Sequence, residues 1–249
     1  MKYAKTSFAD TWKRACERKS GEDVVEQLIA VSQHANDVSA IPDDRVLSMI
    51  AKCIFRAGFN WKVVENKWPG FEEAFLGFVP SVLVFQPDEF WDGLASDARI
   101  VRHGAKIRSV RENAQFVLDI ADEYGSFGAF LAEWPEDDCV GLWDVLSKRG
   151  SRLGGNTGRY FLRFIGKDCF LPSRDVVAAV RMAGIDVAEQ PRSKRDLKAV
   201  QEKFNAWQSE TGLTYTKISR VCAMSAGDNI DPATLGAYTA SAAGVIETD

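Results

Sequence analysis

Two features of this sequence have residue types suited to binding chemistry: a tryptophan beside a helix end and a glycine-rich turn. Trp61 follows the segment 57–60, AGFN, in which Gly58 is expected to end a helix as a left-handed cap. Its indole would therefore stand at a helix terminus, where it can offer a stacking face. Residues 153–158, LGGNTG, join two predicted helices, and glycines there allow positive φ and close approach of the backbone. Free amides at the start of the second helix would attract a phosphate.

Both features also have a plain structural explanation. A lone tryptophan often fills a core, and a glycine-rich turn between helices needs no ligand. The sequence also has two runs of basic residues, the second of which surrounds the glycine-rich turn, but composition alone favours solvated helix faces for such runs. The first run contains Arg99, Arg102, Lys106, Arg108 and Arg111, and the second contains Lys148, Arg149, Arg152 and Arg159.

Length and composition limit the class of protein. A chain of 249 residues with 46% hydrophobic content can bury one sizeable core, as one domain or two closely packed lobes. No apolar run reaches the roughly 18 residues that span a bilayer, and the first residues lack a signal segment, so a cytoplasmic protein without membrane contact is expected. The net charge of −4 argues against coating nucleic acid by bulk attraction. The five scattered cysteines predict reduced thiols and no metal site.

The elements that must position these features are helices. No stretch alternates apolar and polar residues long enough to predict a sheet, so the expected fold class is all-α. The predicted organisation is a pair of N-terminal helices in residues 1–40, a main domain over residues 41–228, and a loose tail over residues 229–249. Within the main domain the sequence predicts a long amphipathic helix over 100–124, hairpin helices over 142–150 and 158–165, and closing helices over 197–224.

The chain resembles the DNA-3-methyladenine glycosylase I family of the helix-hairpin-helix DNA glycosylase superfamily. The family's Ala-Gly-x-x-Trp pattern is met by Ala57, Gly58 and Trp61. A later family segment is met by Asp97, Ala98, Ile100, Arg102, His103, Lys106, Ile107, Asn113 and Ala114. The family's hairpin pattern is met by Lys148, Arg149, Gly150, Gly155 and Thr157.

This resemblance implies a helix-hairpin-helix fold and a base-excision repair enzyme. A monofunctional glycosylase of this kind would flip an alkylated purine such as 3-methyladenine out of duplex DNA and hydrolyse its N-glycosidic bond. No cofactor and a monomeric state are expected. The expected base-binding residues are Trp61, Cys53, Phe59 and Trp68, although core packing is the favoured explanation for the last two. The residues expected at the DNA backbone are Gly155, Thr157, Gly158, Arg159 and Arg152, which would position the duplex without reading its sequence.

A catalytic carboxylate is expected shortly after the second hairpin helix. Asp175 is the carboxylate near that position, where it would stabilise the developing sugar cation or orient water; capping of the helix that follows is a comparable explanation. Cys53 stands where the family has a glutamate that recognises the base. The family's zinc ligands have no match here, so no metal is predicted, and His103 is expected to have a structural role at a helix start.

These departures leave two other functions open. The chain is alternatively a non-catalytic helix-hairpin-helix DNA-binding protein, which keeps the hairpin but has lost the chemistry. A third possibility is a helical interaction protein that binds no nucleic acid.

Overall fold

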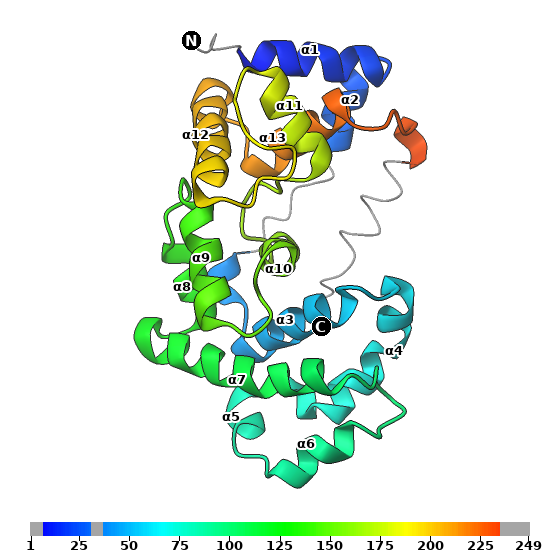
Figure 1. Cartoon of the computed structure of the whole chain (residues 1–249), viewed down its shortest axis with the longest axis vertical. Coiled ribbons are helices and arrows are strands. Elements are labelled where there is room, and N and C mark those ends of the chain that lie inside the picture. Colours follow the sequence, from blue (N-terminus) through cyan, green and yellow to red (C-terminus); the bar gives the residue numbers. More distant parts are fainter. Residues whose placement is uncertain (1–6, 31–36, 235–249) are drawn as a thin grey trace. The chain divides into compact units, whose positions relative to one another are not determined.

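The structure, a computed structural model, describes residues 7–30 and 37–234 and forms two compact units (Figure 1). Of the described residues, unit 1 consists of 7–30, 135–140 and 168–234, and unit 2 consists of 37–134 and 141–167. Across the described residues the chain forms helices and no strand, which confirms the all-α class. The two units do not follow the predicted boundaries of the 41–228 domain, and those boundaries stay a prediction. Residues 235–249 of the predicted tail lie outside the described part of the chain.

Unit 2 is built around α3 (Asp43–Arg56), whose residues from Val46 to Arg56 are all buried. The helix packs against α7 (Gly104–Tyr124) and α10 (Asn156–Ile165), as Figure 1 shows. A helix buried on every side needs long apolar stretches, and α3 meets this with Met49, Ile50, Ile54 and Phe55. The other elements of this unit are η1 (Val38–Ala40), α4 (Trp61–Ala74), η2 (Leu76–Phe78), α5 (Pro80–Leu83), α6 (Asp88–Leu94), α8 (Phe127–Glu133) and, from Gly141 onward, α9 (Cys139–Arg149).

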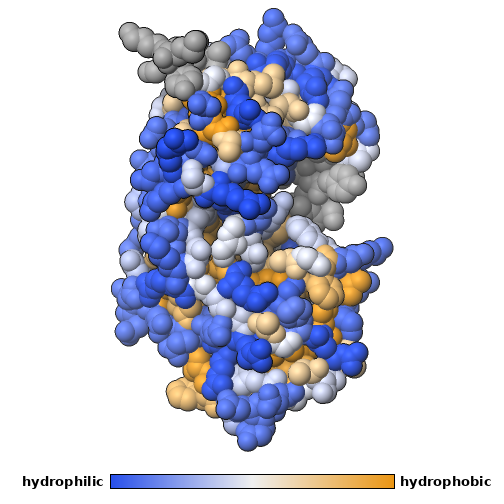
Figure 2. Space-filling model, in the orientation of Figure 1, coloured by the Kyte–Doolittle hydropathy of each residue, from blue (hydrophilic) through white to orange (hydrophobic). Residues whose placement is uncertain are grey.

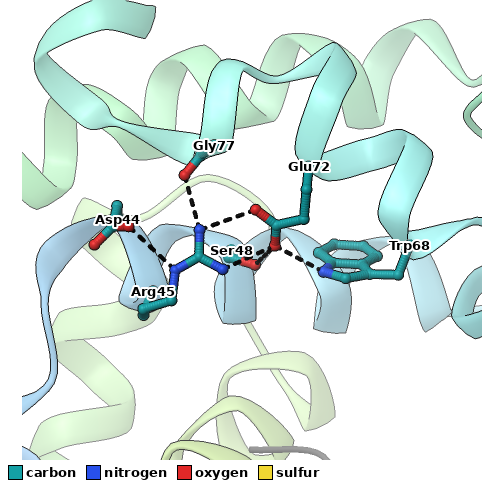
Figure 3. A network of polar contacts seen from close by, with 6 residues as sticks. All are labelled: Asp44, Arg45, Ser48, Trp68, Glu72 and Gly77. Atoms are coloured by element: carbon teal, nitrogen blue, oxygen red, sulfur yellow. Dashed lines mark hydrogen bonds and ion pairs between the residues drawn. The ribbon is translucent and has the colours of Figure 1, made fainter. Parts of the chain in front are cut away.

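A polar network ties α3 to α4 and to the turn after it (Figure 3). The Glu72 carboxylate accepts hydrogen bonds from Arg45 at 3.0 and 2.9 Å, from the Ser48 hydroxyl at 2.7 Å and from the Trp68 indole at 3.0 Å. Arg45 also donates to the Gly77 carbonyl at 2.8 Å. Burial raises the pKa of Glu72, but these donors and the Arg45 charge outweigh it, so the net pKa lies below the ordinary value. The network therefore holds an ionised carboxylate between the two helices.

Unit 1 contains α1 (Phe8–Arg18), α2 (Glu22–Ala30), α11 (Arg174–Met182), α12 (Lys194–Thr211) and α13 (Tyr215–Ala226). Helix α13 packs against α1 and α11. The core of unit 1 includes a cluster of aromatic side chains, in which the ring centroid of Phe204 lies 4.6 Å from that of Phe170 and 5.7 Å from that of Trp207. On α12, Leu197, Val200, Phe204 and Trp207 are all buried, so the first of the predicted closing helices contributes to this core.

Hydrophobic residues also reach the surface, as separate patches among hydrophilic ones on the face shown in Figure 2. Phe85 is the most exposed large apolar side chain described, and the exposed aromatics of unit 2 also include Phe59, Trp61 and Tyr160. Among residues 7–30 and 37–234, none of the helices combines the length and apolar character needed to cross a bilayer.

Candidate nucleic-acid interface

Trp61 is the first residue of α4 and stands beside the end of α3, as predicted. Gly58 has φ +73° and turns the chain after α3, while the Asn60 side chain caps α4 by accepting from the Lys62 amide at 3.0 Å. The side chains of Trp61 and Phe59 are both 44% exposed. Trp61 therefore does not fill the core, and part of its side chain is exposed at a helix terminus.

Two aromatic side chains of the second hairpin helix contact Trp61. Tyr160 and Phe164 lie four residues apart on α10, and their ring centroids are 5.8 and 5.9 Å from that of Trp61, both in edge-to-face geometry. Tyr160 is itself 37% exposed. The predicted stacking residue and the predicted DNA-binding hairpin therefore belong to one side-chain cluster within unit 2. Sequence reasoning missed Tyr160 and Phe164, although their spacing of four on a predicted helix was a usable signal.

A buried arginine completes this cluster. The Arg56 guanidinium lies 5.1 Å from the ring centroids of both Trp61 and Phe164, and the residue is only 4% exposed. One of its nitrogens pairs with Glu65 on α4, whereas Nε and Nη1 have no hydrogen-bond partner. A cation between two ring faces is favourable, and more so when water is excluded. Arg56 and Glu65 were also missed by sequence reasoning.

Cys53 lies in the same neighbourhood, on α3 one turn before Arg56. Burial raises the pKa of its thiol to about 12, with a further rise from the Glu65 charge and opposing effects from Arg56 and Lys52. The thiol is therefore neutral at pH 7 and is a weak hydrogen-bond acceptor. Cys53 therefore lies close to Arg56 and Glu65, but its side chain is a thiol and cannot supply the carboxylate that the family has at this position.

Two residues of the matched signature support the segment that carries Trp61. The buried Lys106 ammonium donates to the carbonyls of Phe55 at 3.1 Å and Ala57 at 2.6 Å, at the end of α3. Its Nζ also lies 5.0 Å from the Phe59 ring centroid. His103 caps α7, with Nδ1 accepting from the Lys106 amide at 3.4 Å, which confirms its expected structural role. Lys106 is therefore engaged inside the protein and is not part of a solvated basic face.

The hairpin turn runs from the end of α9 at Arg149 to the start of α10 at Asn156. The second helix begins two residues before the predicted Gly158, because the turn is shorter than the glycine pattern indicated. Asn113 on α7 holds the turn by a reciprocal pair of bonds, donating to the Ser151 carbonyl at 3.0 Å and accepting from the Ser151 amide at 2.9 Å. The signature asparagine thus positions the hairpin.

The glycines of the hairpin have different structural roles. Gly155 has φ +60° and lacks a side-chain cap, and a Cβ added there would meet no atom within 4 Å. At Gly158, by contrast, an added Cβ would lie 2.3 Å from the Leu153 carbonyl oxygen. Gly155 therefore leaves an open approach to the amides at the start of α10, while Gly158 allows the turn to close tightly.

The basic residues expected at the DNA backbone differ in their availability. Arg152 is exposed and has φ +59°. Arg159 is partly packed, because its guanidinium lies 4.6 Å from the Trp143 ring centroid and donates to the Asn156 side chain at 3.3 Å. Burial lowers the pKa of Arg159.

Two other predicted site residues have structural surroundings of their own. Trp68 is 8% exposed and stacks on Phe71 and Phe78, with ring centroids 4.9 and 5.5 Å away, so packing accounts for it. Asp175 lies in the first turn of α11 in unit 1, where its carboxylate accepts from the Arg174 side chain at 3.0 Å. The capping explanation for Asp175 is wrong, because Ser173 caps α11 by accepting from the Val176 amide. Its catalytic role stays a prediction.

We expect Gly158→Ala to weaken binding of duplex DNA and to destabilise unit 2. The added methyl has to displace the Leu153 carbonyl, and overpacking of this kind costs about 1–3 kcal/mol. Thermal unfolding measures the stability, and fluorescence anisotropy with a duplex that carries a tetrahydrofuran abasic site measures the binding. Gly93→Ala in α6 is the control, since an added Cβ there meets open space. Parent-like binding and stability in Gly158→Ala would contradict the described turn.

Within the described part of the chain, no group of three or more His, Cys, Asp or Glu side chains is arranged to hold a metal ion. All five cysteines are free thiols.

Comparison with known proteins agrees with the resemblance in the sequence. Residues 37–142 match the sequence model of the methyladenine glycosylase family, which confirms the predicted family relationship for the segment that contains Trp61; the hairpin turn lies beyond this segment. No curated protein is similar enough to count as a match.

Solved structures with likeness to this chain include two 3-methyladenine DNA glycosylases I. One is 24% identical, covers 50% of this chain and 79% of its own, and has a TM-score of 0.44. The other, from Staphylococcus aureus and described for its 3-methyladenine recognition, is 25% identical, covers 50% of this chain and 77% of its own, and has a TM-score of 0.46. Because these TM-scores are below 0.5, the relationship rests on the sequence match.

Proposed function

We propose that this chain, whose residues 37–142 belong to the methyladenine glycosylase family, is a DNA glycosylase of base-excision repair. Its substrate is duplex DNA that contains alkylated purines such as 3-methyladenine, and its reaction is hydrolysis of the N-glycosidic bond. The observation that carries the proposal is the exposed ring of Trp61, a residue of the family-matched segment, which contacts the second hairpin helix within unit 2. The protein is further proposed to act as a monomer in the cytoplasm without a cofactor.

The first step of the reaction is removal of the damaged nucleotide from the base stack. An enzyme that acts on a base in a duplex rotates it outward and holds it against aromatic side chains. Trp61 offers the ring face for that base, and the neighbouring Phe59 adds a second exposed ring. Base stacking on an aromatic side chain contributes about 1–3 kcal/mol, enough to offset much of the cost of unstacking.

The hairpin holds the DNA backbone while the base is out of the helix. Unpaired amides at the start of α10, beside the open side of Gly155, are donors for a phosphate oxygen, and the positive end of the helix dipole adds to the attraction. Thr157 lies in the same first turn, and the exposed Arg152 adds a positive charge to the turn. These contacts set the position of the duplex and carry no sequence preference.

Bond cleavage makes a modest demand on the protein for this substrate class. A base alkylated at a ring nitrogen is positively charged in DNA and leaves as a neutral molecule, so no group has to protonate it. The remaining need is to stabilise the sugar cation and direct water to it, and a carboxylate is suited to both. We assign this role to Asp175, as the sequence predicts.

The proposal is tested by treating duplex DNA with a methylating agent and identifying the bases that the protein releases. We expect release of free methylated purines by the parent and a decrease of about 100-fold in Asp175→Asn, the range of a lost catalytic acid or base. Binding to the abasic-site duplex should change little in this variant. A parent that binds duplex DNA but releases no base would instead support the non-catalytic DNA-binding function, which the neutral thiol of Cys53 at the family's glutamate position favours.

A further inference from the structure

A carboxylate stands one helical turn after Trp61. Glu65 follows Trp61 by four residues on α4, so the two side chains lie on the same face of the helix. The Glu65 side chain is 38% exposed, which leaves it accessible while it is bound on its inner side. A base stacked on Trp61 would therefore have a charged hydrogen-bond acceptor in its neighbourhood.

Two cations of α3 orient the Glu65 carboxylate. Arg56 pairs with one oxygen, and the Lys52 ammonium lies 3.5 Å from the other. The side chains of Arg56 and Lys52 are only 4% and 11% exposed, so both partners are firmly packed. An ion pair with buried partners has a better-defined geometry than one between two solvated side chains. The carboxylate is thus preorganised and not freely rotating.

Arg56 links this carboxylate to the Trp61 ring. Its guanidinium contacts the faces of Trp61 and Phe164 and at the same time pairs with Glu65. Because Nε and Nη1 of Arg56 have no hydrogen-bond partner, the position of the guanidinium depends on these rings and on the ion pair with Glu65. Displacement of any one member would therefore disturb the others.

The charge of Glu65, on α4, also acts on the Cys53 thiol, on α3. Glu65 is the one acidic group whose charge raises the pKa of the Cys53 thiol. The neutral thiol is a weak acceptor, so the acceptor function in this neighbourhood falls to Glu65.

We propose that Glu65 recognises the extruded base by accepting a hydrogen bond from an N–H at the edge of a purine stacked on Trp61. Arg56 acts as the positioning residue that holds the carboxylate and the indole in register. The ligand class is a purine with an exocyclic amine or a ring N–H, and the proposal rests on the function proposed above. It differs from an ordinary interhelical ion pair, which would leave base recognition unaffected.

The test compares base release with binding to DNA that has no base at the target site. For Glu65→Gln we expect kcat/KM for release of methylated purines to fall by about 10- to 100-fold, the worth of a hydrogen bond to a charged group. Affinity for the tetrahydrofuran abasic-site duplex should stay within about 2-fold of the parent, because no base is present to contact Glu65. Glu73 lies on α4, the same helix as Glu65, and forms an exposed ion pair with Arg99. The control variant Glu73→Gln removes this pair and should behave as the parent in both measurements.

A second variant covers the case in which the loss of charge unfolds the protein. Glu65→Asp keeps the charge beside Arg56 and Lys52 but withdraws the oxygens by one methylene, so base release should still fall while the fold is retained. Parent-like base release in either folded variant overturns the proposal, and so does an equal loss of base release and of abasic-site binding. A parent that releases no base refutes the proposed function itself, which is a separate result.

Discussion

Trp61→Ala is expected to lower kcat/KM for release of methylated purines by about 10- to 100-fold, with the fold intact. Stacking of a base on an aromatic side chain contributes about 1–3 kcal/mol, and removal of the indole also releases Arg56 from one of its two ring contacts. The tryptophan is 44% exposed, so its loss leaves no large cavity. Single-turnover assays on alkylated duplex DNA measure the rate, and thermal unfolding measures the stability.

Two further variants make the result specific. Trp61→Phe keeps a ring face and should retain more activity than Trp61→Ala. Trp12→Ala removes a half-buried tryptophan of unit 1, whose indole donates to Glu22 at 3.0 Å, and should leave base release unchanged. Base release by Trp61→Ala at the rate of the parent would remove this indole from the proposed site, because no stacking energy could then be assigned to it.

Local features of this fold were predictable from the sequence where a single residue governs the backbone. Gly58 ends α3 with positive φ, and Trp61 then starts the next helix, as the Ala-Gly-x-x-Trp pattern predicts. His103 likewise begins α7 as a cap. These positions depend on φ, on unpaired amides and on neighbouring residues, so they can be read without knowledge of distant contacts.

Roles that depend on distant contacts could not be predicted in this way. Lys106 was expected in a basic run, yet its ammonium caps a helix whose Ala57 carbonyl lies 49 residues away in the sequence. Asn113 holds the hairpin through Ser151, which is 38 residues away. The contact of Arg56 with Phe164 joins α3 to α10, and no local pattern indicates it. Residue type and spacing therefore identified the segments that form the candidate site. The residues that each side chain contacts are set by tertiary packing and could not be predicted from local pattern.

The Lys106 contacts lead to the largest expected effect on stability. Lys106→Met is expected to lower the free energy of unfolding by about 2–4 kcal/mol, because the buried carbonyl of Phe55 and the partly buried carbonyl of Ala57 both lose their donor. The loss also frees the turn that carries Phe59 and Trp61, so base release should fall with it. Denaturant unfolding and the base-release assay together measure both effects.

Lys67→Met is the matched control, because the Lys67 ammonium also donates to a backbone carbonyl, that of Ala98 at 2.7 Å, but at an exposed position. Water can replace this donor, so a change of no more than about 0.5 kcal/mol is expected.

The stability that depends on Lys106 should also change with pH. Burial lowers the pKa of Lys106 in the folded protein. Between that folded pKa and the ordinary value of 10.5 the unfolded chain binds more protons than the folded chain, so the parent gains stability as pH rises through this range. Lys106→Met lacks this gain, and the difference in unfolding free energy between parent and variant should therefore increase over that range. Equal unfolding free energies at neutral pH would show that Lys106 does not hold the end of α3, and the positioning of Trp61 would then need another cause.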